Sequence, residues 1–97
     1  MSDDFWYVYF LRCSDSSLYC GITNNLQRRL REHNLSKRAA KYTRSRRPVE
    51  VVWSREVESR SRALKLEAML KKKSKSQKER IVEIDSDCFS TDQPADQ

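Results

Sequence analysis

The chain of 97 residues is long enough for one domain with a modest core and too short for two. Hydrophobic residues make up 37% of the chain and charged residues 35%, while one glycine and two prolines exclude long flexible linkers. The formal net charge of +6 favours a polyanionic partner.

The N-terminal half predicts a β-hairpin followed by a helix. Seven aromatic or aliphatic residues in a row, Phe5–Leu11, indicate a strand that is buried on both faces. After a polar turn, Leu18–Thr23 predicts a second strand, and the short connection suits a hairpin. Asn24 or Asn25 can then cap a helix that runs to about His33.

The middle of the chain predicts a basic loop, a third strand and a second helix. Residues 34–47 are basic and lack clear periodicity, so we expect a loop that holds a helical turn at most. Val49–Val57 predicts the third strand. Ser59 or Ser61 can begin a second helix that ends near Lys72.

The pattern Ser76-x-x-Glu79 is a capping box, which predicts a third helix from Ser76 to about Ile84. Residues 85–97 are acidic and polar, and we expect a disordered tail there. The element order β-β-α-β-α-α predicts an α+β fold, with three helices on one small three-stranded sheet. The predicted organisation is a single domain over residues 5–84, followed by the tail.

The positive charge is concentrated in the predicted domain. All 20 Lys and Arg residues lie between Phe5 and Ile84 with eight of the 14 acids, so this segment carries +12 and the two ends carry −6. This concentration of charge indicates that the domain binds a phosphate backbone. The alternative is that the charge serves solubility alone. The segment from Arg28 to Arg47 contains nine basic residues and one acidic residue, Glu32. From this stretch, the residues predicted to contact nucleic acid are Arg28, Arg31, Lys41, Tyr42, Arg44, Arg46 and Arg47.

Three cysteines without a C-x-x-C spacing argue against a disulfide framework and for a reducing compartment. A zinc site of Cys13, Cys20 and His33 is a weak alternative, because nothing supplies a fourth soft ligand at metal spacing. The run Phe5–Leu11 is too short to span a membrane, and acids rather than basic residues precede it. We therefore expect a cytoplasmic protein with no membrane partner.

Tyrosines and the single glycine form the first candidate group. Tyrosine is common in strands, so packing in the sheet is the main interpretation for Tyr7. Tyr9 and Tyr19 flank the hairpin and can point toward one cleft. Gly21 follows two residues after Tyr19, where a side chain could block a close approach.

Arg29 and His33 form the second candidate group, one helical turn apart on the edge of the apolar stripe. The guanidinium is a planar fork that matches a phosphate group. Histidine can bind the same phosphate or move a proton near neutral pH. The alternative is that His33 is a partly buried polar residue without a chemical role.

Glu67 is the only acid in residues 59–78, which contain eight Lys or Arg residues. It falls on the apolar stripe of Leu66 and Leu70, where a carboxylate is costly unless it is paired or binds a metal. The alternative is an i,i+4 ion pair with Lys71, worth about 0.3 kcal/mol. One carboxylate suffices for Mg²⁺ when the substrate supplies phosphate oxygens.

In chain order these groups resemble the GIY-YIG nuclease superfamily over residues 5–84. The residues that carry the resemblance are Tyr7-Val-Tyr9, Tyr19-Cys-Gly21, Arg29, His33 and Glu67. The stretch Ala40–Val49 further resembles the short single-domain bacterial proteins of the YhbQ-like group. Two departures are Ser16 and Lys41, which stand where glycine is expected, and a late asparagine of the family has no clear counterpart.

The resemblance implies a three-stranded antiparallel sheet flanked by helices and metal-dependent hydrolysis of DNA, with structured or branched DNA as one substrate type. It implies Mg²⁺ or Mn²⁺ as the cofactor, with Glu67 as its ligand. Tyr7 and Gly21 would be structural residues of the motif. No separate DNA-binding domain is attached, so target choice would come from this domain or from a partner protein.

The resemblance also implies catalytic roles for Tyr9, Tyr19, Arg29, His33 and Glu67. In this hypothesis Arg29 clamps the scissile phosphate, and either Tyr9 or Tyr19 accepts the proton of the attacking water. Nearby cations must then lower the tyrosine pKa, and His33 draws the tyrosine proton away. The alternative function is a DNA- or RNA-binding module that keeps the fold without useful catalysis, and a third is a structural docking protein.

Overall fold

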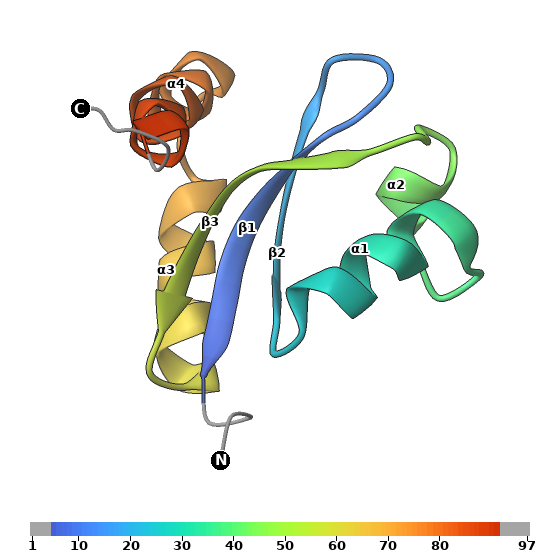
Figure 1. The fold of residues 1–97 in the computed structure, drawn as a ribbon, viewed down its shortest axis with the longest axis horizontal. Helices are drawn as coiled ribbons and strands as arrows, with labels where there is room; N and C mark the ends of the chain where they lie inside the picture. The colour runs from blue at the N-terminus through green and yellow to red at the C-terminus, as the bar shows by residue number, and fades with distance from the viewer. Residues whose placement is uncertain (1–4, 92–97) are drawn as a thin grey trace.

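A three-stranded antiparallel sheet forms the middle layer of the computed structural model, which describes residues 5–91 (Figure 1). The strands are β1 (Trp6–Arg12), β2 (Leu18–Thr23) and β3 (Glu50–Val57), in the spatial order β2-β1-β3. Both neighbours run antiparallel to β1. The central place of β1 explains its unbroken apolar sequence, because both of its faces are covered.

Helices cover both faces of the sheet. α1 (Leu26–Leu35) and the short α2 (Lys41–Arg44) lie on one side, which we call the α1 face (Figure 1). α3 (Arg60–Lys71) and α4 (Lys75–Thr91) lie on the other, the α3 face. The predicted α+β fold with an antiparallel sheet is confirmed, and α2 is the helical turn allowed for in the basic loop. Within residues 5–91 no helix is long and apolar enough to cross a membrane.

Alternation along β1 divides the core between the two faces. Val8 and Phe10 point into the cluster under α3 and α4, with Trp53 of β3 as its largest member. Tyr9 and Leu11 point the other way, into the cluster under α1. The α1 face therefore receives Tyr9 together with Leu11, and the α3 face receives Val8 and Phe10.

Side-chain caps fix the starts of the helices. The Asn25 side chain accepts from the backbone N–H of Arg28 at 3.0 Å, so Asn25 caps α1. The Ser59 hydroxyl accepts from the N–H of Arg62 at 3.2 Å and caps α3. Each of these bonds shows which of the two predicted residues caps the helix.

The predicted capping box of the last helix is wrong. The residues that exchange these bonds are Ser74 and Gln77, at 3.2 Å from the Gln77 N–H to the Ser74 hydroxyl and 3.0 Å from the Ser74 N–H to the Gln77 side chain. Glu79 instead accepts two bonds from the Arg12 guanidinium, at 2.5 and 2.7 Å. This ion pair ties β1 to α4 and holds the Glu79 pKa at about 2.

The last helix is also longer than predicted. α4 continues to Thr91, so residues 85–91 of the predicted disordered tail are helical. Neither glycine nor proline occurs between Lys75 and Thr91, so no helix-breaking residue stops α4 at Ile84. The remaining part of the predicted tail, residues 92–97, lies outside the described residues.

Ser16, in the turn between β1 and β2, has a backbone φ of 72°. This left-handed conformation favours glycine, which is the residue expected there from the family pattern. Lys41, the other position where glycine was expected, begins α2 with an ordinary helical backbone. The family's glycine therefore has a conformational reason at position 16 but none at position 41.

Ser16→Gly is expected to raise the free energy of unfolding by about 0.5 to 1 kcal/mol. The substitution removes the strain of a side chain in the left-handed region, and the Ser16 carbonyl keeps its bonds from Arg12 and Lys75. Urea denaturation of the two proteins measures the difference. A lower stability of the variant would show that the Ser16 side chain contributes more than its backbone strain costs.

Candidate active site

A buried chain of polar side chains crosses the α1 face. The Tyr9 hydroxyl lies 3.0 Å from Nε2 of His33, and Nδ1 of His33 lies 2.7 Å from the Thr43 hydroxyl. Tyr9 is 1% exposed, and His33 and Thr43 are fully buried. β1, α1 and α2 each contribute one residue, so the chain joins three elements that are distant in sequence.

The donors and acceptors in these hydrogen bonds can be assigned starting from Thr43. Its single hydroxyl proton is directed at the Ala40 carbonyl oxygen, 3.0 Å away, which can only accept. The Thr43 oxygen must therefore accept from Nδ1 of His33. A neutral imidazole carries one proton, so Nε2 accepts from the Tyr9 hydroxyl.

His33 is neutral in this environment. Burial lowers its pKa to about 4, and the charge of Arg29 acts in the same direction. Both ring nitrogens are engaged by hydroxyl groups, so His33 is not a ligand for the zinc site considered from the sequence. In the described part of the chain, no group of three or more His, Cys, Asp or Glu side chains could hold a metal ion.

Tyr19 lies beside this chain at the edge of the sheet. Its ring meets the His33 ring edge-on, with centroids 5.4 Å apart, and stacks on the Tyr42 ring at 5.9 Å. Unlike Tyr9, Tyr19 is only partly buried. The structure thus brings both predicted tyrosines to His33 and leaves Tyr19 as the one that reaches the surface.

Gly21 is paired directly with Tyr9 across the β1–β2 ladder. A Cβ atom at this position would lie 2.6 Å from the Tyr9 hydroxyl oxygen and 3.1 Å from Cε2 of Tyr19. The absence of a side chain therefore gives the two tyrosines their space. Tyr7, two residues before Tyr9 on the same face of β1, is half-buried and pairs with Thr23 of β2.

Gly21→Ala is expected to lower the free energy of unfolding by about 2 kcal/mol, because Tyr9 has no room to move away. Chemical denaturation of Gly21→Ala, Tyr9→Phe and the double variant measures the coupling. Since the hydroxyl is the closest atom, the alanine should cost about 1 kcal/mol less in the Tyr9→Phe protein. An equal cost in both backgrounds would contradict the clash with the hydroxyl.

Arg29 projects from α1 beside the buried chain, with its side chain 26% exposed. Its Nη1 donates to the Glu32 carboxylate at 2.8 Å and to the Arg38 carbonyl at 2.9 Å. Both bonds are made by one nitrogen, and the guanidinium also interacts with the Tyr9 hydroxyl, so Arg29 adjoins the buried chain. Arg29 and His33 lie on the same side of α1, as their spacing predicts.

Glu67 comes to this region from the opposite face of the sheet. β2 is an edge strand, and α3 packs on it from the side opposite α1. The side chain of Glu67 is 17% exposed and lies 3.3 Å from the Lys71 ammonium group. Burial raises the pKa of the Tyr19 hydroxyl, and the charges of Lys71, Arg29 and Glu67 also act on it, so these three groups lie within electrostatic range of Tyr19.

The donor set at this edge fits a hard divalent cation. The Glu67 carboxylate lies beside the Lys71 ammonium group and within electrostatic range of the Tyr19 hydroxyl, while the Glu32 carboxylate is bound by Arg29. Mg²⁺ and Mn²⁺ take oxygen ligands and keep several water molecules, so one carboxylate together with phosphate oxygens can hold them.

The expected lowering of the tyrosine pKa is wrong for the free protein. Burial raises the pKa of Tyr9, and the lowering by Arg29 is smaller. Burial also raises the pKa of Tyr19, against the opposing charges of Lys71 and Arg29. Desolvation of the phenolate outweighs the cations at both positions.

The residues predicted to contact nucleic acid divide into two groups. Arg28, Arg31, Lys41 and Arg44 are exposed on α1 and α2. Arg46 is half-buried, since its Nε donates to Asp15 at 3.0 Å and its guanidinium lies 3.9 Å from the Tyr42 ring centroid. The Tyr42 ring, predicted to contact nucleic acid, is thus already in contact with Arg46 and Tyr19.

Arg47 was predicted to contact nucleic acid, but its side chain holds the end of α1 in the structure. Its Nε donates to the His33 carbonyl at 2.5 Å, and its Nη2 donates to the Ser36 carbonyl. These oxygens belong to the end of α1, where helix carbonyls have no intrahelical partner. The guanidinium therefore caps α1 and holds the basic loop against it.

Sequence analysis missed two residues that organise this region. Thr43 orients His33, and the only signal for it was its place in the stretch Ala40–Val49 that resembles the short bacterial group. The Asn34 side chain exchanges two bonds with the Val49 backbone, at 2.8 and 2.9 Å, and ties α1 to the start of β3. No sequence pattern marked Asn34. Lys71 was considered only as an ion-pair partner.

Comparison with known proteins gives consistent matches. A family model described as the GIY-YIG catalytic domain matches residues 5–80. A UPF0213 protein of Syntrophus aciditrophicus is 51% identical over 76 residues, which cover 78% of this chain and 87% of that protein. A UPF0213 protein of Vibrio cholerae is 49% identical over 78 residues, covering 79% and 76%.

A solved structure is also similar. The solution NMR structure of a UPF0213 protein from Bacillus halodurans has a TM-score of 0.58 and 34% identity, and the match covers 92% of this chain and 94% of that one. The similarity therefore extends over the whole sheet and the helices on both of its faces.

Proposed function

The chain belongs to the GIY-YIG catalytic domain family, which is a nuclease-type family, and on that premise we propose that it is a divalent-metal-dependent endonuclease acting on DNA. Structured or branched DNA is the proposed substrate type. The observation that carries the proposal is the buried Tyr9–His33–Thr43 chain with the Tyr19 ring packed on His33, and with Arg29 and Glu67 within electrostatic range of Tyr19.

Arg29 is proposed to hold the scissile phosphate. A planar guanidinium matches phosphate oxygens, and that of Arg29 is held in place by Glu32, the Arg38 carbonyl and the Tyr9 hydroxyl. A guanidinium held in this way needs little reorganisation as negative charge develops on the phosphate. Its bond to Glu32 therefore serves orientation and does not compete with the substrate.

Tyr19 is proposed as the tyrosine that meets the attacking water. A general base must lie within hydrogen-bonding distance of the proton it takes, and Tyr19 is the partly exposed tyrosine of the pair. Lys71 and Arg29 favour its phenolate but are outweighed by burial, so a divalent ion held by Glu67 would supply the further positive charge that lets Tyr19 accept the proton of the water. Tyr9 donates to His33 inside the protein, so this pair positions Tyr19 and is not in contact with water.

Glu67 is proposed to hold one Mg²⁺ or Mn²⁺ ion, with phosphate and water oxygens as the other ligands. Such an ion, when bound, neutralises charge on the phosphate and on the leaving oxygen. The Lys71 ammonium group lies 3.3 Å from the same carboxylate. The exposed residues Arg28, Arg31, Lys41 and Arg44 are proposed to contact the backbone of the substrate without reading its sequence.

The test is a cleavage assay with nicked, branched and single-stranded DNA and with RNA, in Mg²⁺ or Mn²⁺, beside a Glu67→Ala variant. The proposal expects cleavage of at least one DNA substrate that requires the metal and is lost in the variant. Cleavage that persists unchanged in Glu67→Ala would come from a contaminant or a different ligand set. Binding without cleavage of any substrate would favour the nucleic-acid-binding module.

A further inference from the structure

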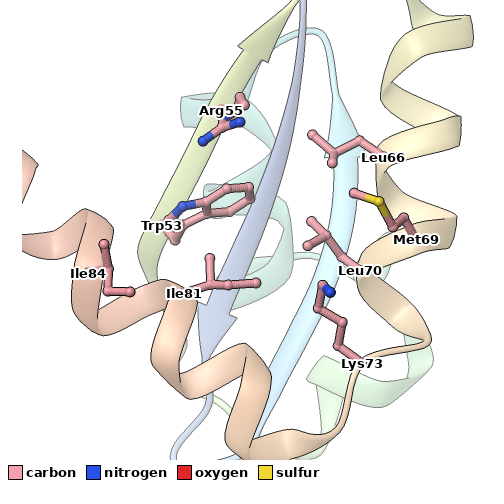
Figure 2. Close-up of a pocket in the computed structure, with 8 residues that line it drawn as sticks. All are labelled: Trp53, Arg55, Leu66, Met69, Leu70, Lys73, Ile81 and Ile84. Atoms are coloured by element: carbon pink, nitrogen blue, oxygen red, sulfur yellow. The ribbon is translucent and has the colours of Figure 1, made fainter.

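An apolar groove of about 260 Å³ opens on the α3 face, between α3, α4 and β3 (Figure 2). α3 packs on β1 and β2 while α4 packs on β3, and the groove lies between the two helices. Trp53 of β3 lies at its centre (Figure 2). The helices supply its apolar walls, which are Leu66, Met69 and Leu70 from α3 and Ile81 and Ile84 from α4.

Two of these apolar side chains reach far into solvent. Met69 is 52% exposed and Ile84 is 57% exposed, one on each side of the groove. Single exposed apolar residues are ordinary, but two that flank one groove form a continuous apolar surface with its walls. A methionine at such a position can adapt its shape to a partner side chain.

The surroundings of the groove are positively charged. Lys73 lines it beside Arg55, a neighbouring hollow adds Lys65 and Arg62, which pairs with Glu58 at 3.8 Å, and a second adds Arg80. Among the described residues that line these three hollows, none is acidic. An occupant with apolar side chains on one face and carboxylates beside them would match both the walls and the rim.

The size of the groove indicates what kind of group enters it. Sites for small molecules typically have about 300 to 1,000 Å³, so a volume of about 260 Å³ suits one or two side chains of a partner. An apolar floor offers nothing to a phosphate backbone, whereas a helix laid between two helices presents side chains at this spacing. These features favour a peptide over a cofactor or a nucleic acid.

We propose that this groove binds an amphipathic helix of a partner protein, with apolar anchors between α3 and α4 and acidic residues facing the basic rim. The proposal does not rest on the nuclease function, because the groove and the Tyr9–His33 chain lie on opposite faces of the sheet.

The probe is a synthetic helical peptide of about 20 residues with leucines along one face and glutamates elsewhere. The chain has two methionines, so the methyl signal of Met69 can be followed by NMR after selective labelling. The proposal expects a saturable shift of this signal. A peptide of the same composition with the leucines scrambled around the helix should not produce it.

Two matched variants locate the contact. Ile84→Glu places an acid in the groove wall, and we expect the peptide to bind about tenfold more weakly. Leu64→Glu places the same charge on α3 at a residue that is 39% exposed and does not line the groove. Its affinity should stay within about twofold of the natural protein.

Four results would overturn the proposal. They are the lack of any peptide binding, equal binding of the scrambled peptide, an unchanged affinity of Ile84→Glu, and a Met69 shift produced by duplex DNA in place of the peptide. A Met69 signal that depends on protein concentration without peptide would assign the groove to a second copy of the chain instead.

Discussion

The free energy of unfolding is expected to fall by about 2 to 3 kcal/mol between pH 7 and pH 4.5 through His33 alone. The pKa of this residue is lowered to about 4 in the folded protein, from an ordinary value of 6.5. Above pH 6.5 it is neutral in both states. As the pH falls below 6.5 the unfolded chain takes up a proton that the folded chain refuses, so stability is lost across this window.

The control for this prediction is His33→Gln, which keeps a polar side chain but has no titration in the window. Urea denaturation at a series of pH values should show a nearly flat stability for the variant between pH 7 and pH 4.5. The pKa values of Asp15, Glu32 and Glu79 are lowered, so their contributions are lost only below about pH 4.5. An equal decline in both proteins would mean that His33 is not the group responsible.

Arg29→Ala is expected to slow single-turnover cleavage by about 100- to 1,000-fold while substrate binding weakens far less. The physical reason is that the guanidinium is held by Glu32 and the Arg38 carbonyl before the substrate arrives. Arg29→Lys keeps the charge but not the planar fork, so it should recover only part of the rate. Thermal unfolding of each variant separates loss of rate from loss of fold.

Arg28→Ala is the matched control, because Arg28 is the exposed neighbour on α1. Its removal should leave the cleavage rate at saturating protein unchanged and weaken binding on all substrates alike. It should also reduce the slope of log affinity against log salt by about 1. If Arg28→Ala and Arg29→Ala had the same effect on rate and binding, Arg29 would be one more backbone contact.

The elements could be predicted well because their signals were local. The apolar run of β1, the hairpin spacing and the capping residues Asn25 and Ser59 each act within a few residues. The last helix was placed less well, because Glu79 fits a capping box in sequence and only the fold brings Arg12 to it. Its end was missed because acidity was taken as a sign of disorder.

In the candidate site, too, local features could be predicted and contacts made by the fold could not. Arg29 and His33 could be paired from helical spacing, and Gly21 stood out as the single glycine of the chain. Thr43 and the turn of Arg47 toward the end of α1 could not be predicted, since both depend on how the basic loop folds back. The rise in the tyrosine pKa values could not be predicted either, because burial is a property of the packed sheet.

The central claim is that the cluster at the β2 edge cleaves phosphodiester bonds and depends on Glu67. The direct measurement is the single-turnover rate of Glu67→Gln against the natural protein, on the DNA substrate that is cleaved best. Glutamine keeps the shape of the side chain and removes its charge. We expect the rate to fall by at least about 100-fold with substrate affinity nearly unchanged. A variant that cleaves as fast as the natural protein, with the same metal requirement, would contradict the claim.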